Sequence, residues 1–109
     1  MNENWTPWKM LSATVGAGTL TPGWNLAESP STEEGEWRIF TQRITFDGAF
    51  SGPPVVVIGL TGFDLDQRDS GRVSVKSREI TRDGFVVEIT SWRGTRVYAV
   101  EFSWLAVGA

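Results

Sequence analysis

The chain has 109 residues, a formal charge of −3 at pH 7, six Trp and six Phe against one Tyr, and neither Cys nor His. This length allows one domain with one hydrophobic core. The missing residue types exclude disulfides, thiolate nucleophiles, zinc fingers and imidazole bases, and the acidic balance argues against nucleic acid, for which a basic surface supplies most of the affinity.

The pattern along the chain is that of an all-β domain. Helical periodicity is nearly absent, and clusters of Gly, Pro and Ser separate short runs rich in Val, Ile, Thr and Phe. Six short antiparallel strands in a chain of this length make a compact, six-stranded antiparallel β-sandwich. We expect these strands over residues 9–20, 37–46, 53–60, 72–81, 85–92 and 96–107, with longer loops over residues 21–36 and 61–71.

Glycines mark where the expected strands bulge or turn. Gly16 and Gly18 interrupt the first strand and indicate a bulge or a close backbone approach. Asp47-Gly48 marks the turn that follows the second strand. Arg82-Asp83-Gly84 predicts a hairpin with a type I′ turn, because Asp-Gly readily adopts positive φ angles.

The third expected strand is apolar on both faces, since residues 55–58 read Val-Val-Val-Ile. Such a strand must be covered on both sides. Either it occupies a central position in its sheet, or one of its faces lies at a subunit interface. Alternation in the other strands assigns Phe46, Phe102 and Trp104 to the core.

The last two expected strands meet at a tight polar turn, Trp92-Arg93-Gly94-Thr95, with Tyr98 just beyond it. We expect a hairpin whose tip brings aromatic rings and guanidinium groups together. A guanidinium forms bidentate hydrogen bonds, and an aromatic face accepts the C–H side of a sugar ring, so this tip suits flat, hydroxyl-bearing ligands such as sugars. The alternative is that Trp92 and Tyr98 form a cross-strand pair that only stabilises the hairpin.

Most of the chain resembles the H-type lectins, the family of the snail agglutinin and the C-terminal domain of discoidin. The resemblance covers residues 23–109, after an N-terminal arm and first strand over residues 1–22, within what we expect to be a single compact domain. It implies a six-stranded sandwich that forms a homotrimer, sometimes stacked into a hexamer, with galactose or N-acetylgalactosamine in a shallow site near the junction between protomers. The pieces that carry it, by their order and spacing, are Gly23-Trp24, Ile44-Thr45-Phe46, Pro53-Pro54-Val55-Val56, Gln67, Arg72-Val73, Thr81 with Gly84-Phe85, Thr90 with Trp92, Thr95, Val97-Tyr98 and Ser103-Trp104-Leu105.

Position by position, the resemblance implies a carbohydrate-binding site. Arg72 matches the arginine that hydrogen-bonds sugar hydroxyls, Trp92 the tryptophan that flanks the ring, and Tyr98 the aromatic residue that helps to close the site. Without the resemblance, Arg72 reads as a solvated charge at a strand edge. Arg93 stands where the snail protein has a histidine that contacts the N-acetyl and hydroxyl groups, and this departure bears on the preference for N-acetylated sugars.

The acidic residue of the site is a second departure. The family uses an aspartate to accept hydrogen bonds from galactose hydroxyls, and ungapped matching places Gly35 at that position. Glu34 or Glu36 could substitute, with a different side-chain length. The alternative is that this acidic run is a solvated loop.

These features predict an oligomeric, non-enzymatic lectin for galactose- or N-acetylgalactosamine-type glycans, or for related ones such as capsular polysaccharide. Two other classes stay open: a trimeric adaptor or phage-like receptor-binding module without a monosaccharide site, and a glycoside hydrolase, which needs only two suitably spaced carboxylates. A calcium loop at Asp64, Asp66 and Asp69 lacks the Gly and terminal Glu of an EF-hand, so we expect no metal and no cofactor. No secretory signal or membrane span is visible, so we expect cytoplasmic synthesis, followed by release or by incorporation into an extracellular particle or appendage.

Overall fold

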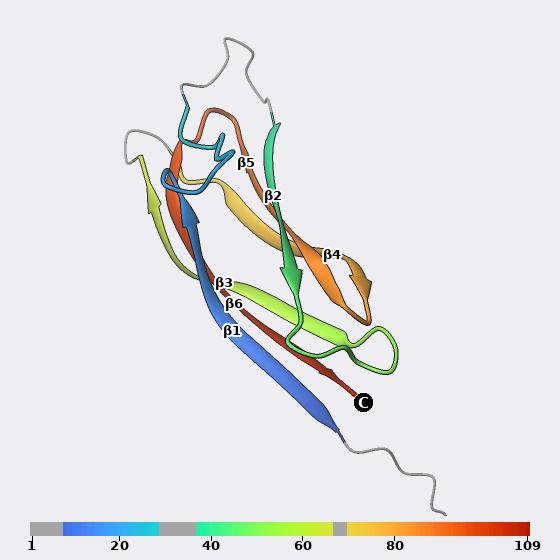
Figure 1. The fold of residues 1–109 in the computed structure, drawn as a ribbon. Coiled ribbons are helices and arrows are strands. Elements are labelled where there is room, and N and C mark those ends of the chain that lie inside the picture. Colours follow the sequence, from blue (N-terminus) through green and yellow to red (C-terminus); the bar gives the residue numbers. More distant parts are fainter. Residues whose placement is uncertain (1–7, 29–36, 67–69) are drawn as a thin grey trace, which may run out of the picture.

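The fold consists of two antiparallel three-stranded sheets packed face to face (Figure 1). The computed structural model describes residues 8–28, 37–66 and 70–109, and no helix in these ranges could cross a membrane. Sheet A has the strand order β1-β6-β3, and sheet B has the order β2-β5-β4. The six-stranded antiparallel β-sandwich predicted from the sequence is therefore confirmed. The strands are β1 (Lys9–Gly18), β2 (Trp37–Thr45), β3 (Val55–Leu65), β4 (Val73–Thr81), β5 (Gly84–Trp92) and β6 (Val97–Gly108).

The largest difference from the expected strands is the length of β3. The sequence predicted a strand that ends at residue 60 and a loop from residue 61, but β3 continues to Leu65. A register shift between Leu60 and Gly62 marks a β-bulge, after which β3 goes on pairing with β6. Because a bulge inserts an extra residue, the regular alternation that sequence analysis relies on is broken there although the pairing is not.

The core lies between the sheets and is rich in aromatic rings. The ring centroid of Phe46 lies 5.8 Å from that of Phe85 and 5.7 Å from that of Trp104, and Phe85 and Trp104 are 5.4 Å apart. Burial of each such side chain contributes roughly 1.5–3 kcal/mol to folding. Phe46, Phe102 and Trp104 are all buried, as alternation predicted.

β4 and β5 form the predicted hairpin, but its turn is not of type I′. Thr81 pairs with Gly84, so Arg82 and Asp83 are the central residues of the turn. A type I′ turn needs positive φ at both central residues, and neither is among the described residues with positive φ. Gly84 has another reason to be glycine: a Cβ there would lie 2.1 Å from the carbonyl oxygen of Ile44 on β2.

The predicted hairpin between the last two strands is wrong. β5 is the central strand of sheet B and β6 is the central strand of sheet A, so each already has a neighbour on both edges and they cannot pair with each other. The turn from Trp92 to Thr95 instead carries the chain from one sheet to the other. The alternative that Trp92 and Tyr98 form a cross-strand pair is also wrong, because the two residues lie on strands of different sheets.

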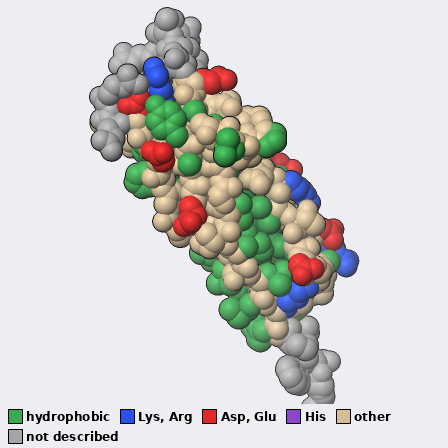
Figure 2. Space-filling view, turned by 60° about the vertical axis from the view of Figure 1, so that its left-hand side comes forward, with side chains coloured by type: hydrophobic (Ala, Val, Ile, Leu, Met, Phe, Trp, Pro, Cys, Tyr) green, Lys and Arg blue, Asp and Glu red, His purple; other side chains and the backbone are tan. Residues whose placement is uncertain are grey.

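β3 lies at an edge of sheet A, so the first of the two alternatives for this strand, a central position, is excluded, and a subunit interface is the one left open. Its inward side chains pack on the core, while Val57 is 59% exposed on the outer surface. In Figure 2, hydrophobic side chains gather over the lower half of the molecule, toward the end where β1 begins. The outer apolar face, as we call it, consists of the ladder rows Met10–Val107–Val55 and Leu105–Val57.

Candidate functional site

Arg72 and Trp92 lie next to each other at one end of sheet B. Val73, the first residue of β4, pairs with Ser91 on β5. Arg72 directly precedes this last pair of the ladder and Trp92 directly follows it, so their backbones are neighbours. Val73 packs on the core and Ser91 is buried, so alternation turns Arg72 and Trp92 to the outer face of the sheet. The structure thus brings together two residues that the sequence analysis selected.

The backbone of Arg72 is tied to the turn that follows Trp92. The N–H of Arg72 donates to Oγ1 of Thr95 at 3.2 Å, and that hydroxyl donates to the carbonyl oxygen of Ser70 at 2.9 Å. Thr95 is 3% exposed, and these two hydrogen bonds are part-buried. The guanidinium of Arg72 donates to the same Ser70 carbonyl through Nη1 at 3.4 Å.

An inward-facing arginine supports this turn from the core side. Arg38 lies on the same face of β2 as the buried Phe40, a face that is otherwise unsuited to a charge. Its Nη2 donates to the carbonyl oxygen of Thr95, and its Nη1 donates to the carbonyl oxygen of Glu28 at 2.9 Å. A half-buried guanidinium is tolerated there because backbone carbonyl oxygens accept hydrogen bonds from its N–H groups.

Arg93 is the first central residue of the turn, and its backbone is left-handed. Its φ angle is 57°, that of Gly94 is 81°, and the N–H of Thr95 donates to the carbonyl oxygen of Trp92 at 3.4 Å. Positive φ at both central residues is the type I′ geometry that the sequence analysis expected at the other turn. A bulky residue in this conformation is uncommon, and its side chain is exposed.

Trp37 also lies at this end of sheet B, although it was not among the residues predicted for the site. Trp37 pairs with Trp92 across the β2–β5 ladder, and their rings stack at 4.7 Å between centroids with 13° between planes. Trp37 is 61% exposed. The sequence places one tryptophan at the start of an expected strand and another at the end of a different one. Only the register of the β2–β5 ladder reveals that these two residues are neighbours.

Tyr98 lies on the other sheet, near the start of β6. It falls between Val97 and Ala99, whose partners on β3 are the consecutive residues Leu65 and Asp64, so it is the extra residue of a bulge. Its hydroxyl donates to Oδ2 of Asp66 at 3.2 Å. Tyr98 is thus held at the same end of the sandwich as the turn, but through β3 and not beside Trp92. Glu34, Glu36 and Gly35 lie outside the described residues.

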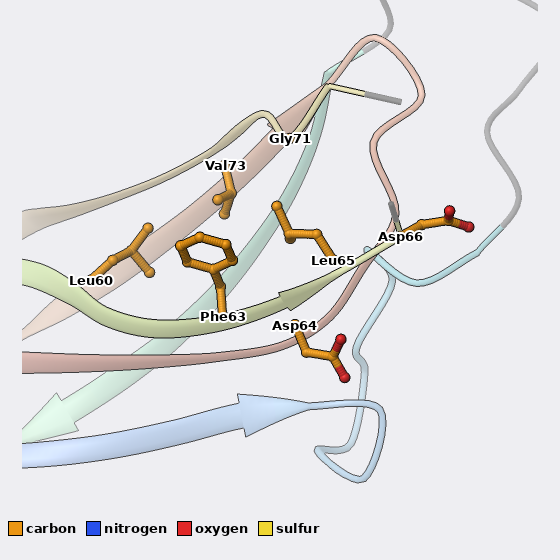
Figure 3. A pocket seen from close by; sticks show the side chains of 7 residues that line it. All are labelled: Leu60, Phe63, Asp64, Leu65, Asp66, Gly71 and Val73. Atoms are coloured by element: carbon orange, nitrogen blue, oxygen red, sulfur yellow. The ribbon is translucent and has the colours of Figure 1, made fainter. Parts of the chain in front are cut away.

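A hollow of about 620 Å³ opens between the edges of β3 and β4, and Gly71, the residue before Arg72, is one of the residues that line it. In Figure 3, Leu60, Phe63, Leu65 and Val73 turn toward one another there, whereas the carboxylates of Asp64 and Asp66 point away from them. Among the described residues that line it, the hollow therefore lacks a facing pair of carboxylates of the kind that glycosidases use.

Residues 41–107 match the H-type lectin domain family. The chain belongs to this family. The matched range includes Arg72, Trp92, Arg93 and Tyr98, while Trp37 and the acidic run before it lie outside.

The solved structures agree with the family on the fold. The wild-type structure of discoidin II from Dictyostelium discoideum has a TM-score of 0.74 at 24% identity, and the native structure of recombinant discoidin II has a TM-score of 0.72 at 24% identity. They cover 99% and 98% of this chain, and the chain covers 39% of discoidin II in each case. A protein of Fuscovulum blasticum described as "ATP synthase subunits region ORF 7" is 33% identical over 72 residues, which make up 66% of this chain and 63% of that relative.

Proposed function

We propose that this member of the H-type lectin family is an oligomeric, non-enzymatic lectin that binds galactose- or N-acetylgalactosamine-type sugars through Arg72, Trp92 and Arg93, with Tyr98 at the same end of the sandwich. The observation that carries the proposal is the adjacency of Arg72 and Trp92 on the outer face of sheet B, with the Arg72 backbone anchored to the turn by Thr95. A pre-ordered pair of this kind spends little free energy on ordering when a ligand binds.

The chemistry of the two side chains matches a sugar ring. The planar fork of a guanidinium donates two hydrogen bonds to neighbouring hydroxyls, and an indole packs against the C–H side of the ring. One charge-assisted hydrogen bond contributes about 1.5–3 kcal/mol, out of roughly 4 kcal/mol for a millimolar monosaccharide site. The loss of Arg72 alone would therefore abolish measurable binding.

Two positions adjust the specificity. Arg93 offers a longer, permanently charged donor at the place of the snail histidine, which favours ligands rich in hydroxyl or carboxylate oxygens over the N-acetyl group. Glu34 or Glu36 is proposed to supply the acceptor that the family takes from an aspartate.

We further propose that the protein is a homotrimer whose interface includes the outer apolar face. Exposed Val55, Val57 and Met10 form a contiguous apolar surface with their ladder partners, and contiguous apolar surface on a small domain marks an interaction site. Three weak sites that face one way can raise avidity by about 10²–10⁴-fold without any new contact.

A glycan array with the purified protein tests this function. We expect signals on galactosides that are lost in Arg72→Ala and Trp92→Ala, while light scattering shows an unchanged oligomeric mass. Lys76→Ala is the matched control, because Lys76 is an exposed cation on the same face of sheet B. Silence of the wild-type protein across galactosides and capsular polysaccharides would favour an adaptor, and release of reducing sugar from polymeric galactosides would favour a hydrolase.

A further inference from the structure

We propose that Trp37 forms a second sugar subsite beside the Arg72–Trp92 pair, so that the protein binds an extended saccharide of two or more units more tightly than a single terminal sugar. The inference rests on the proposed lectin function and adds a ligand class to it. Trp37 lies outside residues 41–107, which match the family.

The direction of the indole stack defines where the free ring faces point. Trp37 and Trp92 are partners across the β2–β5 ladder, and their ring planes are 13° apart with 4.7 Å between centroids, so the two rings form an offset stack across this ladder. Each ring therefore covers one face of the other. The remaining face of Trp92 lies on the side of β4, the strand that Arg72 precedes, and the remaining face of Trp37 lies on the side of the sheet edge.

Among residues 8–28, 37–66 and 70–109, no strand lies beside that face of Trp37. β2 is the outermost strand of sheet B on this side, and the side chain is 61% exposed in spite of its stacking partner. Ile39, two residues further along the same face of β2, is also exposed. The result is an apolar strip along the edge strand that begins directly beside the proposed monosaccharide site.

The chemistry of this strip selects one kind of ligand. Pyranose rings of the galactose type present several C–H groups on one face, and such a face packs against an indole while the hydroxyls stay in water. A contact of this type recognises the presence of a ring more than its substituents. The second subsite is therefore expected to tolerate different sugars but to require a unit linked to the one that Arg72 holds.

The test compares one sugar with two. Titration calorimetry is carried out with methyl galactoside and with a galactosyl-galactose disaccharide on the wild-type protein, Trp37→Ala, Trp37→Phe and Trp8→Ala. The wild-type protein is expected to bind the disaccharide about tenfold more tightly than the methyl galactoside, from the apolar area that one indole face removes from water. Trp37→Ala loses this gain and keeps its affinity for the methyl galactoside, whereas Trp37→Phe retains most of it.

Trp8→Ala is the matched control, because Trp8 is a 79% exposed tryptophan outside the strip. It is expected to leave both affinities unchanged. Equal loss of both affinities in Trp37→Ala would overturn the subsite, because Trp37 would then only hold Trp92 in place. An unchanged gain in Trp37→Ala, or a wild-type protein that binds both ligands equally, would also overturn it. A wild-type protein that binds neither ligand would refute galactose-type binding itself.

Discussion

The buried hydroxyl of Thr95 connects Arg72 to the turn that carries Trp92. It accepts the N–H of Arg72 at 3.2 Å and donates to the carbonyl oxygen of Ser70 at 2.9 Å. The segment before β4 and the turn after β5 are therefore held together by one side chain. This relationship fixes both proposed sugar contacts at once.

Thr95→Val is expected to lower both stability and sugar affinity. Valine keeps the shape of threonine but removes the two hydrogen bonds, and a buried polar group left unsatisfied costs about 1–3 kcal/mol. The free energy of unfolding in urea should fall by that amount, and galactoside affinity should fall because Arg72 loses its backbone anchor. Thr41→Val, at an exposed position on the outer face of sheet B, is the control and should change stability by less than about 0.5 kcal/mol. Equal effects of the two substitutions would contradict this account of Thr95.

Two described residues other than glycine have positive φ, Glu79 at 51° and Arg93 at 57°. Glu79 lies in the bulge of β4 next to the hairpin turn, whereas Arg93 lies in the proposed site. A left-handed conformation costs an L-residue roughly 1–2 kcal/mol, and glycine in its place loses about 0.5–1 kcal/mol through backbone entropy. Both substitutions to glycine should therefore stabilise the fold by about 0.5–1 kcal/mol.

The two glycine variants should differ in function. Glu79→Gly gains stability with unchanged galactoside affinity, while Arg93→Gly gains stability and loses affinity, since strain retained at a site is offset by what the side chain does there. Thermal unfolding and calorimetry on the same samples measure both quantities. Glu79→Ala keeps the strain and should show no gain. If Arg93→Gly binds as tightly as the wild-type protein, Arg93 is not a ligand contact.

Local patterns were sufficient to predict the six strands, because alternation and turn residues are written into neighbouring positions. They were insufficient to predict which strands pair with one another. The tight turn from Trp92 to Thr95 predicted a hairpin between β5 and β6. The sequences of these two strands do not reveal that each one is paired on both edges with other strands. Trp37 was missed for the same physical reason, because its stacking on Trp92 depends on a ladder between distant segments.

Gly84 shows how a correct element can be predicted for an incorrect reason. The Asp83-Gly84 pair predicted a positive φ angle in the turn, but a Cβ at Gly84 would lie 2.1 Å from the carbonyl oxygen of Ile44. Gly84→Ala is expected to destabilise the protein by about 3 kcal/mol or more, because the contact is with backbone that cannot move aside. Gly59→Ala, at a position with no heavy atom within 4 Å of an added Cβ, should be neutral or slightly stabilising in the same urea titration. A harmless Gly84→Ala would show that β2 and β5 approach less closely than described.

The outer apolar face gives the most direct test of the proposed trimer. Val57→Asp places a charge in the middle of this face, at a side chain that is 59% exposed in the single chain. Burial of an unpaired carboxylate at an interface is strongly unfavourable, whereas the same carboxylate is hydrated on a free subunit. We therefore expect a folded monomer by light scattering, with normal thermal unfolding, and a loss of about 10²-fold or more in binding to a galactose-coated surface. Thr41→Asp, on the outer face of the opposite sheet, should leave the oligomeric mass unchanged. Retention of the wild-type mass by Val57→Asp would exclude this face as the interface.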